Sequence, residues 1–449
     1  MTQKTSPIPL RVSLRASTWE AVGAEVLTAC VGSTVLTAWA IHLGLSPLAL
    51  AALAAAPHLA QVLQFPAAWI TTLSGYRRTT LVSLSAARQV YWGLAVLPWL
   101  DVSVSTQRWM LLCIAGAAAT LGVVGNNGWV AWMGELVPTR LRGRYFARRT
   151  AVGALSGALA SLLAGALLDA AAARGQAGLV LSLLGLVACT VGAFTTLMLA
   201  RKGCPAPPAA APPTWASTVA VLRDANIRPV LHYQAAWHSA IGFSSAFFAL
   251  HLVDNLGLGF VFVALYHGIL HATRMFSVGV WGGAVDRFGT KPVLVACSIG
   301  LTPLPLLWLA PAPLRALILP FDAAIAGTLL AGHGLAMLTL PLAFSPRAQR
   351  PFYVATFSAV GGVALALGAA VAGLLAHLLP VSLVLGGARF YGLEVLFVIS
   401  AVLRASASWR SAHLLEPRAK PTADLMRWMQ LGAKERLAGV RFAAMMIRR

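Results

Sequence analysis

The chain has 449 residues, of which 58% are hydrophobic and only 10% charged, whereas about a quarter of the residues of an ordinary soluble protein are charged. Such a chain cannot cover its own core with polar surface, which excludes a typical soluble protein. Its net charge of +21 is compatible with nucleic-acid binding. The basic residues lie mostly between apolar stretches, however, so we expect no nucleic-acid partner.

Apolar stretches recur along nearly the whole sequence, and a helix needs about 20 such residues to cross the hydrocarbon of a membrane. The first stretch contains Glu20 and Glu25, which is typical of a span rather than of a cleaved signal. The five cysteines show no CxxC spacing, so we expect no disulfide and no metal site. The twelve predicted spans are residues 20–43, 48–72, 80–100, 108–132, 145–169, 178–200, 230–253, 260–284, 292–311, 316–343, 353–379 and 390–410.

The distribution of Lys and Arg predicts the orientation of these spans. If the N-terminus is cytoplasmic, 27 of the 34 basic residues fall in inner segments or at their edges, and four fall in outer loops. Because basic residues are retained on the cytoplasmic side, we expect a multi-pass protein of the inner membrane with both termini in the cytoplasm.

A proline-rich segment, residues 201–229, divides the chain, and we expect it to carry a short amphipathic helix at 214–226. The predicted organisation is therefore a cytoplasmic segment 1–19, a six-helix bundle 20–200, the linker 201–229, a second bundle 230–412 and a tail 413–449. From residue 420 the tail reads either as a basic amphipathic helix on the anionic inner leaflet or as a solvated basic segment.

The two halves resemble each other at a shift of 208 residues. Such a parallel repeat predicts two six-helix bundles related by a pseudo-twofold axis along the membrane normal, with a central cavity between them. The matched pairs are Pro138 and Pro346, Arg142 and Arg350, Tyr145 and Tyr353, Ala147 and Ala355, Gly153 and Gly361, and Gly165 and Gly373.

The loop after the eighth predicted span carries Gly282, Asp286, Arg287, Gly289 and Lys291. This pattern resembles the signature loop of the major facilitator superfamily. Glycines at these positions permit close helix approach and a tight turn, and an acid at a helix end can pair with a neighbouring helix.

The first half holds related loops. In the first of these, Gly75, Arg77 and Arg78 match the signature, but Thr72 stands in place of its acid. The second loop is similar to the family's acidic, proline and Arg-Gly pattern and contains Glu135, Pro138, Arg142, Gly143 and Arg144.

The resemblance extends over about residues 17–412 and implies an all-α membrane fold of twelve helices and alternating access. It also implies that these loops hold one conformation, although the change at Thr72 puts a latch in the first half in doubt. Each loop can alternatively be a topology signal without special chemistry.

Ionisable groups inside spans are costly unless paired or wet, so each is a candidate for function. His267, His271 and Arg274 lie on one face of the eighth span and could attract an anion, or pack on a neighbouring polar helix. The resemblance places Glu25 of the first span against the cavity, where it could couple transport to protons or pair with a basic side chain.

Other polar residues within spans could likewise either take part in the transport path or join neighbouring helices. Gln234, Trp237 and His238 of the seventh span could contact a substrate, although His238 alone reads more readily as a core histidine. Asn126 and Asn127 could bind a solute or join helices. We expect Arg88 to be structural. Asp322, which we expect near the outer surface, and His333 are further candidates.

The sequence thus predicts a monomeric secondary transporter of a small solute, anionic or polar, driven by an ion gradient and without a cofactor. No nucleotide-binding loop and no HExxH or GxSxG motif is present, so we expect no enzyme activity. The alternatives are a multi-pass membrane enzyme, a receptor-like binding protein, or a partner subunit that has kept the scaffold and lost transport.

Overall fold

A computed structural model describes residues 8–204, 221–310, 312–344, 350–385, 388–414, 416 and 419–430. Nearly all of this chain is helical, as expected for segments that must satisfy their backbone hydrogen bonds in lipid. The predicted helix at 214–226 lies largely outside the described residues, as does the tail after residue 430.

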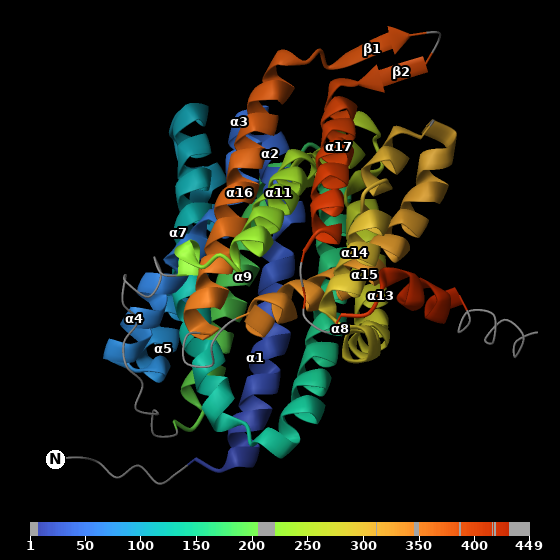
Figure 1. The fold of residues 1–449 in the computed structure, drawn as a ribbon. Helices are drawn as coiled ribbons and strands as arrows, with labels where there is room; N and C mark the ends of the chain where they lie inside the picture. The colour runs from blue at the N-terminus through green and yellow to red at the C-terminus, as the bar shows by residue number, and fades with distance from the viewer. Residues whose placement is uncertain are drawn as a thin grey trace, which may run out of the picture.

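The first half consists of helices that run back and forth across the molecule (Figure 1). Short breaks interrupt some of them, for example at Gly32, where an added Cβ would overlap the carbonyl oxygen of Thr28. The elements are α1 (Leu10–Val31), α2 (Ser33–His42), α3 (Pro47–Leu59), η1 (Ala60–Leu63), α4 (Gln64–Ser74), α5 (Tyr76–Gln89), α6 (Trp92–Val96), η2 (Leu97–Trp99), α7 (Val104–Leu136), α8 (Thr139–Ala172) and α9 (Ala177–Ala200).

The second half repeats this arrangement and ends in a short additional helix at 422–430. Its elements are α11 (Arg228–Ser245), α12 (Phe247–Leu250), η3 (His251–Asn255), α13 (Gly259–Phe288), α14 (Thr290–Leu301), η4 (Leu304–Leu309), α15 (Ala312–Phe344), α16 (Arg350–Leu378), β1 (Ser382–Leu385), β2 (Ala388–Tyr391) and α17 (Gly392–Ala412).

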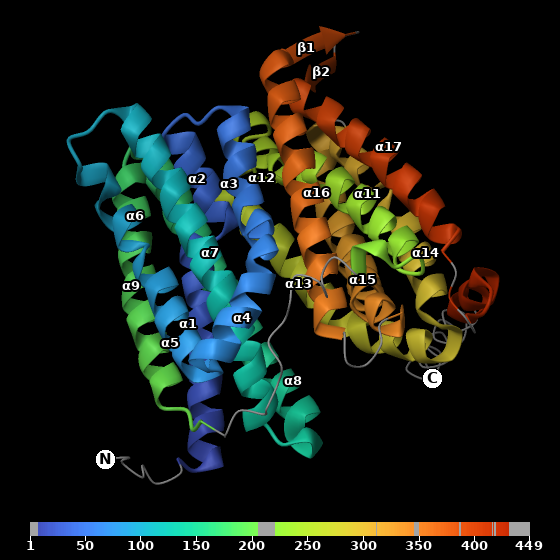
Figure 2. The ribbon, with the colours of Figure 1, turned by 60° about the vertical axis from the view of Figure 1, so that its left-hand side comes forward.

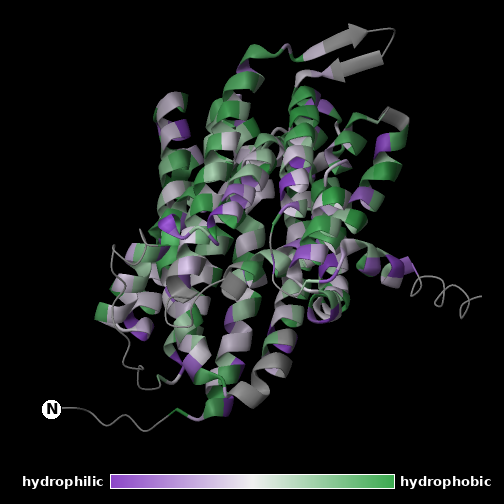
Figure 3. Cartoon of the chain, viewed as in Figure 1, coloured by the Kyte–Doolittle hydropathy of each residue, from purple (hydrophilic) through white to green (hydrophobic). Residues whose placement is uncertain are grey.

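Eleven helical segments of the described chain are long and apolar enough to cross a membrane. They match the predicted spans except the third. There, residues 76–99 are broken after Gln89, and α5 carries Arg77, Arg78 and Arg88. Large apolar side chains such as that of Phe276, 77% exposed, lie at the surface, as lipid contact requires. Hydrophobic residues recur along the helices of both halves (Figure 3).

The predicted all-α fold has no strand at residues 380–389, between the last two predicted spans. These residues contribute to an antiparallel hairpin in which Ser382 pairs with Tyr391 and Leu385 with Ala388. The hairpin projects from one end of the molecule, here called the hairpin end. Helix α1 begins at the opposite end, here called the tail end (Figure 1). Glu394 fixes the start of α17 by accepting hydrogen bonds from Arg315 Nη2 at 2.7 Å and from the Tyr391 amide at 3.2 Å.

The two halves stand side by side and meet through α8 with α13 and through α3 with α16 (Figure 2). A glycine permits each contact. An added Cβ at Gly165 would lie 2.9 Å from the Phe260 carbonyl oxygen, and one at Gly373 would lie 2.9 Å from Leu48 Cα. Because Gly165 and Gly373 are a matched pair of the sequence repeat, the two contacts are equivalent under the pseudo-twofold axis.

Gly242 allows α11 to touch α16 within the second half. We expect Gly242→Ala to cost about 1–3 kcal/mol through overpacking, because the new Cβ would overlap the Leu365 carbonyl oxygen and lie 2.8 Å from the Ala369 nitrogen. Thermal unfolding in detergent measures this as a melting temperature lower by several degrees. The matched control is Gly122→Ala, whose Cβ meets no atom within 4 Å and should leave the melting temperature unchanged or slightly raised. An equal effect of both changes would contradict the packing argument.

Candidate functional site

A cavity of about 610 Å³ lies between the two halves. Helices of both halves line it, and most of the lining side chains are aliphatic or aromatic. The first half contributes hydroxyl groups and His58, and the second half contributes the charged groups. The polar and aromatic-polar lining residues are Thr28, Ser33, Thr37, His58 and Tyr91 from the first half, and Trp237, Ser245, Tyr266, His267, Trp308, Asp322 and Arg404 from the second.

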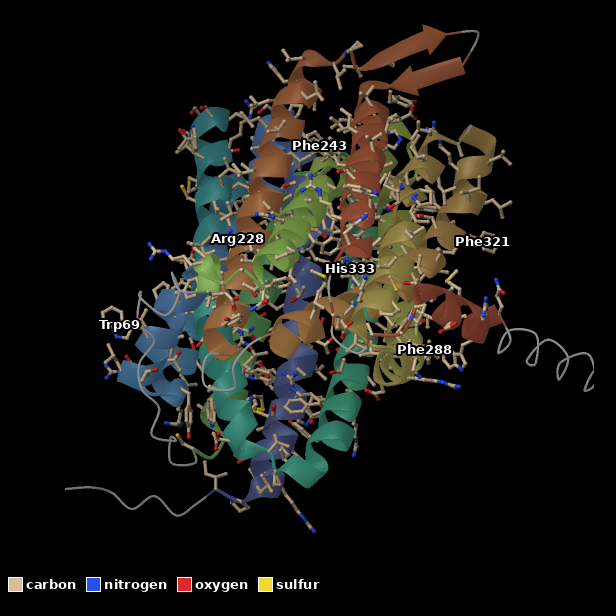
Figure 4. All side chains as sticks on the ribbon, viewed as in Figure 1. Trp69, Arg228, Phe243, Phe288, Phe321 and His333 are labelled. Carbon is tan, nitrogen blue, oxygen red and sulfur yellow. The ribbon has the colours of Figure 1, made fainter. Side chains whose placement is uncertain are left out.

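Asp322 on α15 is the acid of this cavity and is only 1% exposed. Its Oδ2 accepts hydrogen bonds from the Tyr266 hydroxyl at 2.6 Å and from Trp308 Nε1 at 3.2 Å. Its Oδ1 has no hydrogen-bond partner among the described residues. The neighbouring Phe321 is 64% exposed and points away from the bundle (Figure 4), so one helix presents a lipid face and a cavity face side by side.

Arg404 on α17 is the basic residue of the cavity lining. Its guanidinium donates to the Leu301 carbonyl at 3.2 Å and to Ser244 Oγ at 3.3 Å, and it lies over the Trp237 ring at 6.0 Å from the centroid. Arg404 Nε and Trp237 Nε1 have no partner within the described chain. The described part of the cavity wall therefore holds two buried donors and one buried acceptor, on three helices, that have no protein partner.

The expectation that Asp322 lies near the outer surface is wrong. Helix α15 begins at Ala312, four residues before the predicted span, so Asp322 lies ten residues, or about 15 Å, along the helix. Sequence reasoning also assigned no role to Arg404. The available signal was the cost of an ionisable side chain inside a span, which applies to both residues.

The three predicted site residues on one face of α13, His267, His271 and Arg274, do not all line the cavity. His267 lines the cavity, and its ring centroid lies 6.3 Å from that of His271. His271 and Arg274 are exposed and lie further toward the tail end of the same helix. The stripe thus faces one side, as the spacing predicts, but only its first member is part of the central cavity wall.

The polar cluster of α11 divides in a similar way. Trp237 lines the central cavity, while Gln234 and His238 line a second chamber of about 350 Å³ between α3, α11, α15 and α16. His58 belongs to both walls. Gln234 Nε2 donates to the Phe357 carbonyl at 3.3 Å, and His238 Nδ1 lies 3.0 Å from the Gln234 carbonyl, the geometry of a satisfied helix histidine.

His333 lies in the interior of the second half (Figure 4). Its Nε2 is 2.8 Å from the Tyr233 hydroxyl, and its ring stacks on Trp237 at 4.6 Å between centroids. The Tyr233 hydroxyl also lies 2.7 Å from Ser298 Oγ. This buried network supports the cavity wall from behind, because it fixes the Trp237 ring.

The remaining predicted site residues lie away from the central cavity. Asn127 joins helices, since its Nδ2 donates to Gln64 Oε1 at 3.1 Å and its Oδ1 accepts from Thr71 at 3.2 Å. Asn126 is exposed. Glu25 is also exposed, beside Gly153 of α8, and takes part in no ion pair with a described residue.

Glu20 forms a buried charge cluster inside the first half. Its carboxylate lies 3.0 Å from Arg88, 2.8 Å from Arg149 and 3.5 Å from Lys202. The Trp129 ring packs against the last two cations, at 4.5 Å from Arg149 and 5.6 Å from Lys202. Arg88 is only 7% exposed, and in this environment it ties α5 to α1. Four segments of the first half thus meet at one carboxylate.

The signature loop of the second half joins α13 to α14. Gly289 has φ +98°, which permits the turn, and Glu416 accepts hydrogen bonds from the Thr290 and Lys291 amides at 3.1 and 2.6 Å. Gly282 meets no atom within 4 Å of an added Cβ, and Arg287 is exposed. Asp286 is also exposed and has no hydrogen bond or ion pair with a described residue, so the acid of the signature is not engaged there in this conformation.

The short helix at 422–430, which follows α17, packs on protein. Leu425 is fully buried, and Trp428 lies 5.7 Å from Phe288 between ring centroids, at the tail end (Figure 4). Within the predicted lipid-binding tail, Leu425 and Trp428 therefore contact protein.

In the first half, Gly75 has φ +78° and Arg77 Nη2 donates to the Ala200 carbonyl at 3.2 Å. Arg78 and Glu135 are exposed, and Pro138 is the residue before α8. Arg142, Gly143 and Arg144 lie on the first turns of α8, where side chains are outside the described set.

No group of three or more possible metal ligands is found among the described residues.

A family model described as Major Facilitator Superfamily matches residues 24–319, which is well over half of the chain. The chain belongs to the Major Facilitator Superfamily. It is thus a multi-pass membrane protein of a family of small-solute transporters.

Solved structures of the major facilitator fold resemble this one. The nucleoside transporter NupG aligns with a TM-score of 0.67 at 11% identity, over 90% of this chain and 98% of that one. A bacterial metal transporter gives 0.60 at 14%, over 91% and 99%, and a D-xylose-proton symporter gives 0.57 at 15%, over 91% and 97%. No curated protein matches the sequence. At these identities the likeness shows the fold alone.

The two glutamates of α1 give a matched test of the charge cluster. Glu20→Gln leaves three cations, of which Arg88 and Lys202 are buried, without their carboxylate, so we expect a loss of about 3–5 kcal/mol in stability, seen as low yield and a lowered melting temperature in detergent. Glu25→Gln, an exposed position on the same helix, should behave as the parent. A Glu20→Gln protein as stable as the parent would contradict the structural role of the cluster.

Proposed function

We propose that this chain is a secondary carrier that moves a small polar solute across the cytoplasmic membrane by alternating access, coupled to protons through Asp322. The observation that carries the proposal is the pair of buried, oppositely charged side chains, Asp322 and Arg404, in the wall of the cavity between the halves. Following the distribution of basic residues, the tail end faces the cytoplasm.

Asp322 suits proton coupling better than Glu25, the candidate suggested by the sequence. A buried carboxylate pays a large desolvation cost for its charge, which proton binding removes. Asp322 is 1% exposed, and its nearest hydrogen-bond donors are neutral. Glu25 is exposed and outside the lining of the central cavity, so it can keep its charge without a partner.

The cavity supports a solute of a particular chemistry. Its volume of about 610 Å³ is within the usual range for small-molecule sites. The free groups of Trp237, Asp322 and Arg404 would bind a solute that carries both hydrogen-bond acceptors and donors, while the aromatic rings would cover an apolar or ring-shaped face. A neutral or anionic organic molecule meets these requirements.

The contacts between the halves support an alternating mechanism. The α8–α13 contact occurs where α8 ends and α13 begins, at the hairpin end. Toward the tail end, Gly279, Gly282 and Gly283 of α13 meet no atom within 4 Å of an added Cβ. The second chamber extends the space between the halves, since His58 lines both cavities. This conformation is therefore closed at the hairpin end, as an inward-facing carrier would be.

The similar structures are those of a nucleoside transporter, a D-xylose-proton symporter and a metal transporter. One fold thus serves three classes of cargo, and the choice among solutes has to come from the site. A partner subunit without transport is the alternative function, and the loss of the signature acid at Thr72 favours it. We also propose that the basic tail contacts anionic lipid and that the protein is a monomer.

The decisive experiment combines binding with flux. A panel of nucleosides, sugars, amino acids and organic acids is screened for solutes that raise the melting temperature of the purified protein. Uptake of a stabilising solute into proteoliposomes is then measured with and without an inward proton gradient. We expect accumulation only with the gradient. Binding without any movement would contradict the carrier and favour the alternative.

Asp322→Asn should abolish accumulation driven by the proton gradient and retain solute exchange between the two sides, because the amide fills the same site but binds no proton. Arg404→Lys should raise the KM about tenfold, the cost of one lost hydrogen bond to a charged group. Asp101→Asn, at an exposed acid of the loop before α7, is the control. Gradient-driven accumulation by Asp322→Asn at the parent's level would exclude Asp322 as the coupling group.

A further inference from the structure

We infer that Asp169 is the latch that closes this carrier at the hairpin end. Asp169 lies near the end of α8 in the first half, and its carboxylate binds the first turn of α13 in the second half. Oδ1 accepts a hydrogen bond from the Phe260 amide at 2.6 Å, and Oδ2 accepts one from the Val261 amide at 2.9 Å. The inference rests on the proposed alternating access, because a latch has a role only if the halves part.

The first turn of α13 needs this carboxylate. The amides at the start of a helix have no partner within the helix, and they carry the positive end of its dipole. Leu258, the residue before α13, provides no side-chain cap. Asp169 supplies the cap from the other half of the protein, through short hydrogen bonds to a charged acceptor.

Two glycines make room for this contact. An added Cβ at Gly259 would lie 2.9 Å from Asp169 Oδ2, and one at Gly165, a turn before Asp169, would lie 2.9 Å from the Phe260 carbonyl oxygen. Gly259 also has φ +76°, a conformation that other residues rarely adopt. The backbone of both halves is thus shaped so that the carboxylate reaches the helix end.

The equivalent contact between α16 and α3 lacks such a latch. The residue matched to Asp169 by the repeat is His377, which is exposed. Helix α3 caps itself, since Ser46 Oγ accepts a hydrogen bond from the Ala49 amide at 3.3 Å. Gly373 allows close packing at that contact, beside Ala51. Within the described chain, the polar interaction between the halves at the hairpin end therefore belongs to the α8–α13 contact and not to the α3–α16 contact, and it depends on Asp169.

Opening the hairpin end must break both hydrogen bonds and leave the carboxylate and the two amides without their partners. Asp169 has no ion-pair partner among the described residues, so its bonds to α13 account for the fastening. Removing them favours the state that is open at the hairpin end. Asp169 is a positioning residue in this scheme and does not touch the solute.

The test measures the two conformations directly. Nitroxide labels are placed in the full-length protein at exposed positions, with Ala173 and Asp254 reporting on the hairpin end and Arg148 and Asp286 on the tail end. The exposed Cys113 and Cys204 are replaced by Ser. Distance distributions are recorded by double electron–electron resonance for the parent, for Asp169→Ala and for Asp169→Asn, with Asp101→Ala as a matched surface control.

We expect Asp169→Ala to raise the population with a long hairpin-end distance and a short tail-end distance by about tenfold, as the loss of one or two charge-assisted hydrogen bonds implies. Asp169→Asn, which keeps one neutral acceptor, should give an intermediate value. Gly259→Ala, which displaces the carboxylate without removing its charge, should shift the populations in the same direction and provides a third variant if the others fold poorly. Unchanged distributions in the folded variants would overturn the latch.

The outcome is separable from that of the proposed function. A chain that transports solute but shows unchanged distances in the Asp169 variants overturns the latch and leaves the carrier. A chain that moves no solute but shows the expected shift supports the latch, and its proposed function fails instead.

Discussion

The cost of placing charge in hydrocarbon is the constraint on which this structure depends. Within the described spans, two carboxylates meet it by strong pairing: Glu20 is surrounded by three cations, and Glu394 binds Arg315. Asp169 meets it through two backbone amides. Asp322 and Arg404 differ, because each keeps a buried polar atom without a protein partner. Elsewhere in the fold, a buried polar atom without a partner would destabilise the protein. In a cavity wall, such an atom is the condition for binding a solute.

Small residues determine how the halves meet. Gly165 and Gly373 occupy equivalent places in the repeat, and each brings a helix of one half against a helix of the other. The contact of α8 with α13 adds a carboxylate, whereas that of α3 with α16 relies on close packing beside Ala51. Two contacts that are equivalent in backbone geometry thus differ in chemistry. At the closed end, the strength of the contact between α8 and α13 therefore depends on a single side chain, Asp169.

Much of the fold could be predicted from the sequence, since lipid requires long apolar helices and the repeat at 208 residues requires two similar halves. The repeat also matches Gly165 with Gly373, and the structure places these two glycines at equivalent contacts between the halves. The site was harder to predict. The depth of Asp322 depended on a helix start four residues earlier than expected, and the pairing of Glu20 with Arg88 joins residues 68 positions apart. The hairpin at 382–391 was missed because its residues fall in a short segment between two long spans.

The charged groups of the two halves serve different purposes. In the first half, the cations Arg88, Arg149 and Lys202 are engaged with Glu20, away from the central cavity, and the wall it presents carries hydroxyls and His58. In the second half, Asp322 and Arg404 face the cavity and are held by neutral groups. On the proposed function, the second half therefore recognises the solute and the proton, and the first half moves as an internally cross-linked body against it. This division requires that the parting of the halves leave the bonds of Asp322 to Tyr266 and Trp308 intact, which is possible because all three residues belong to the same half.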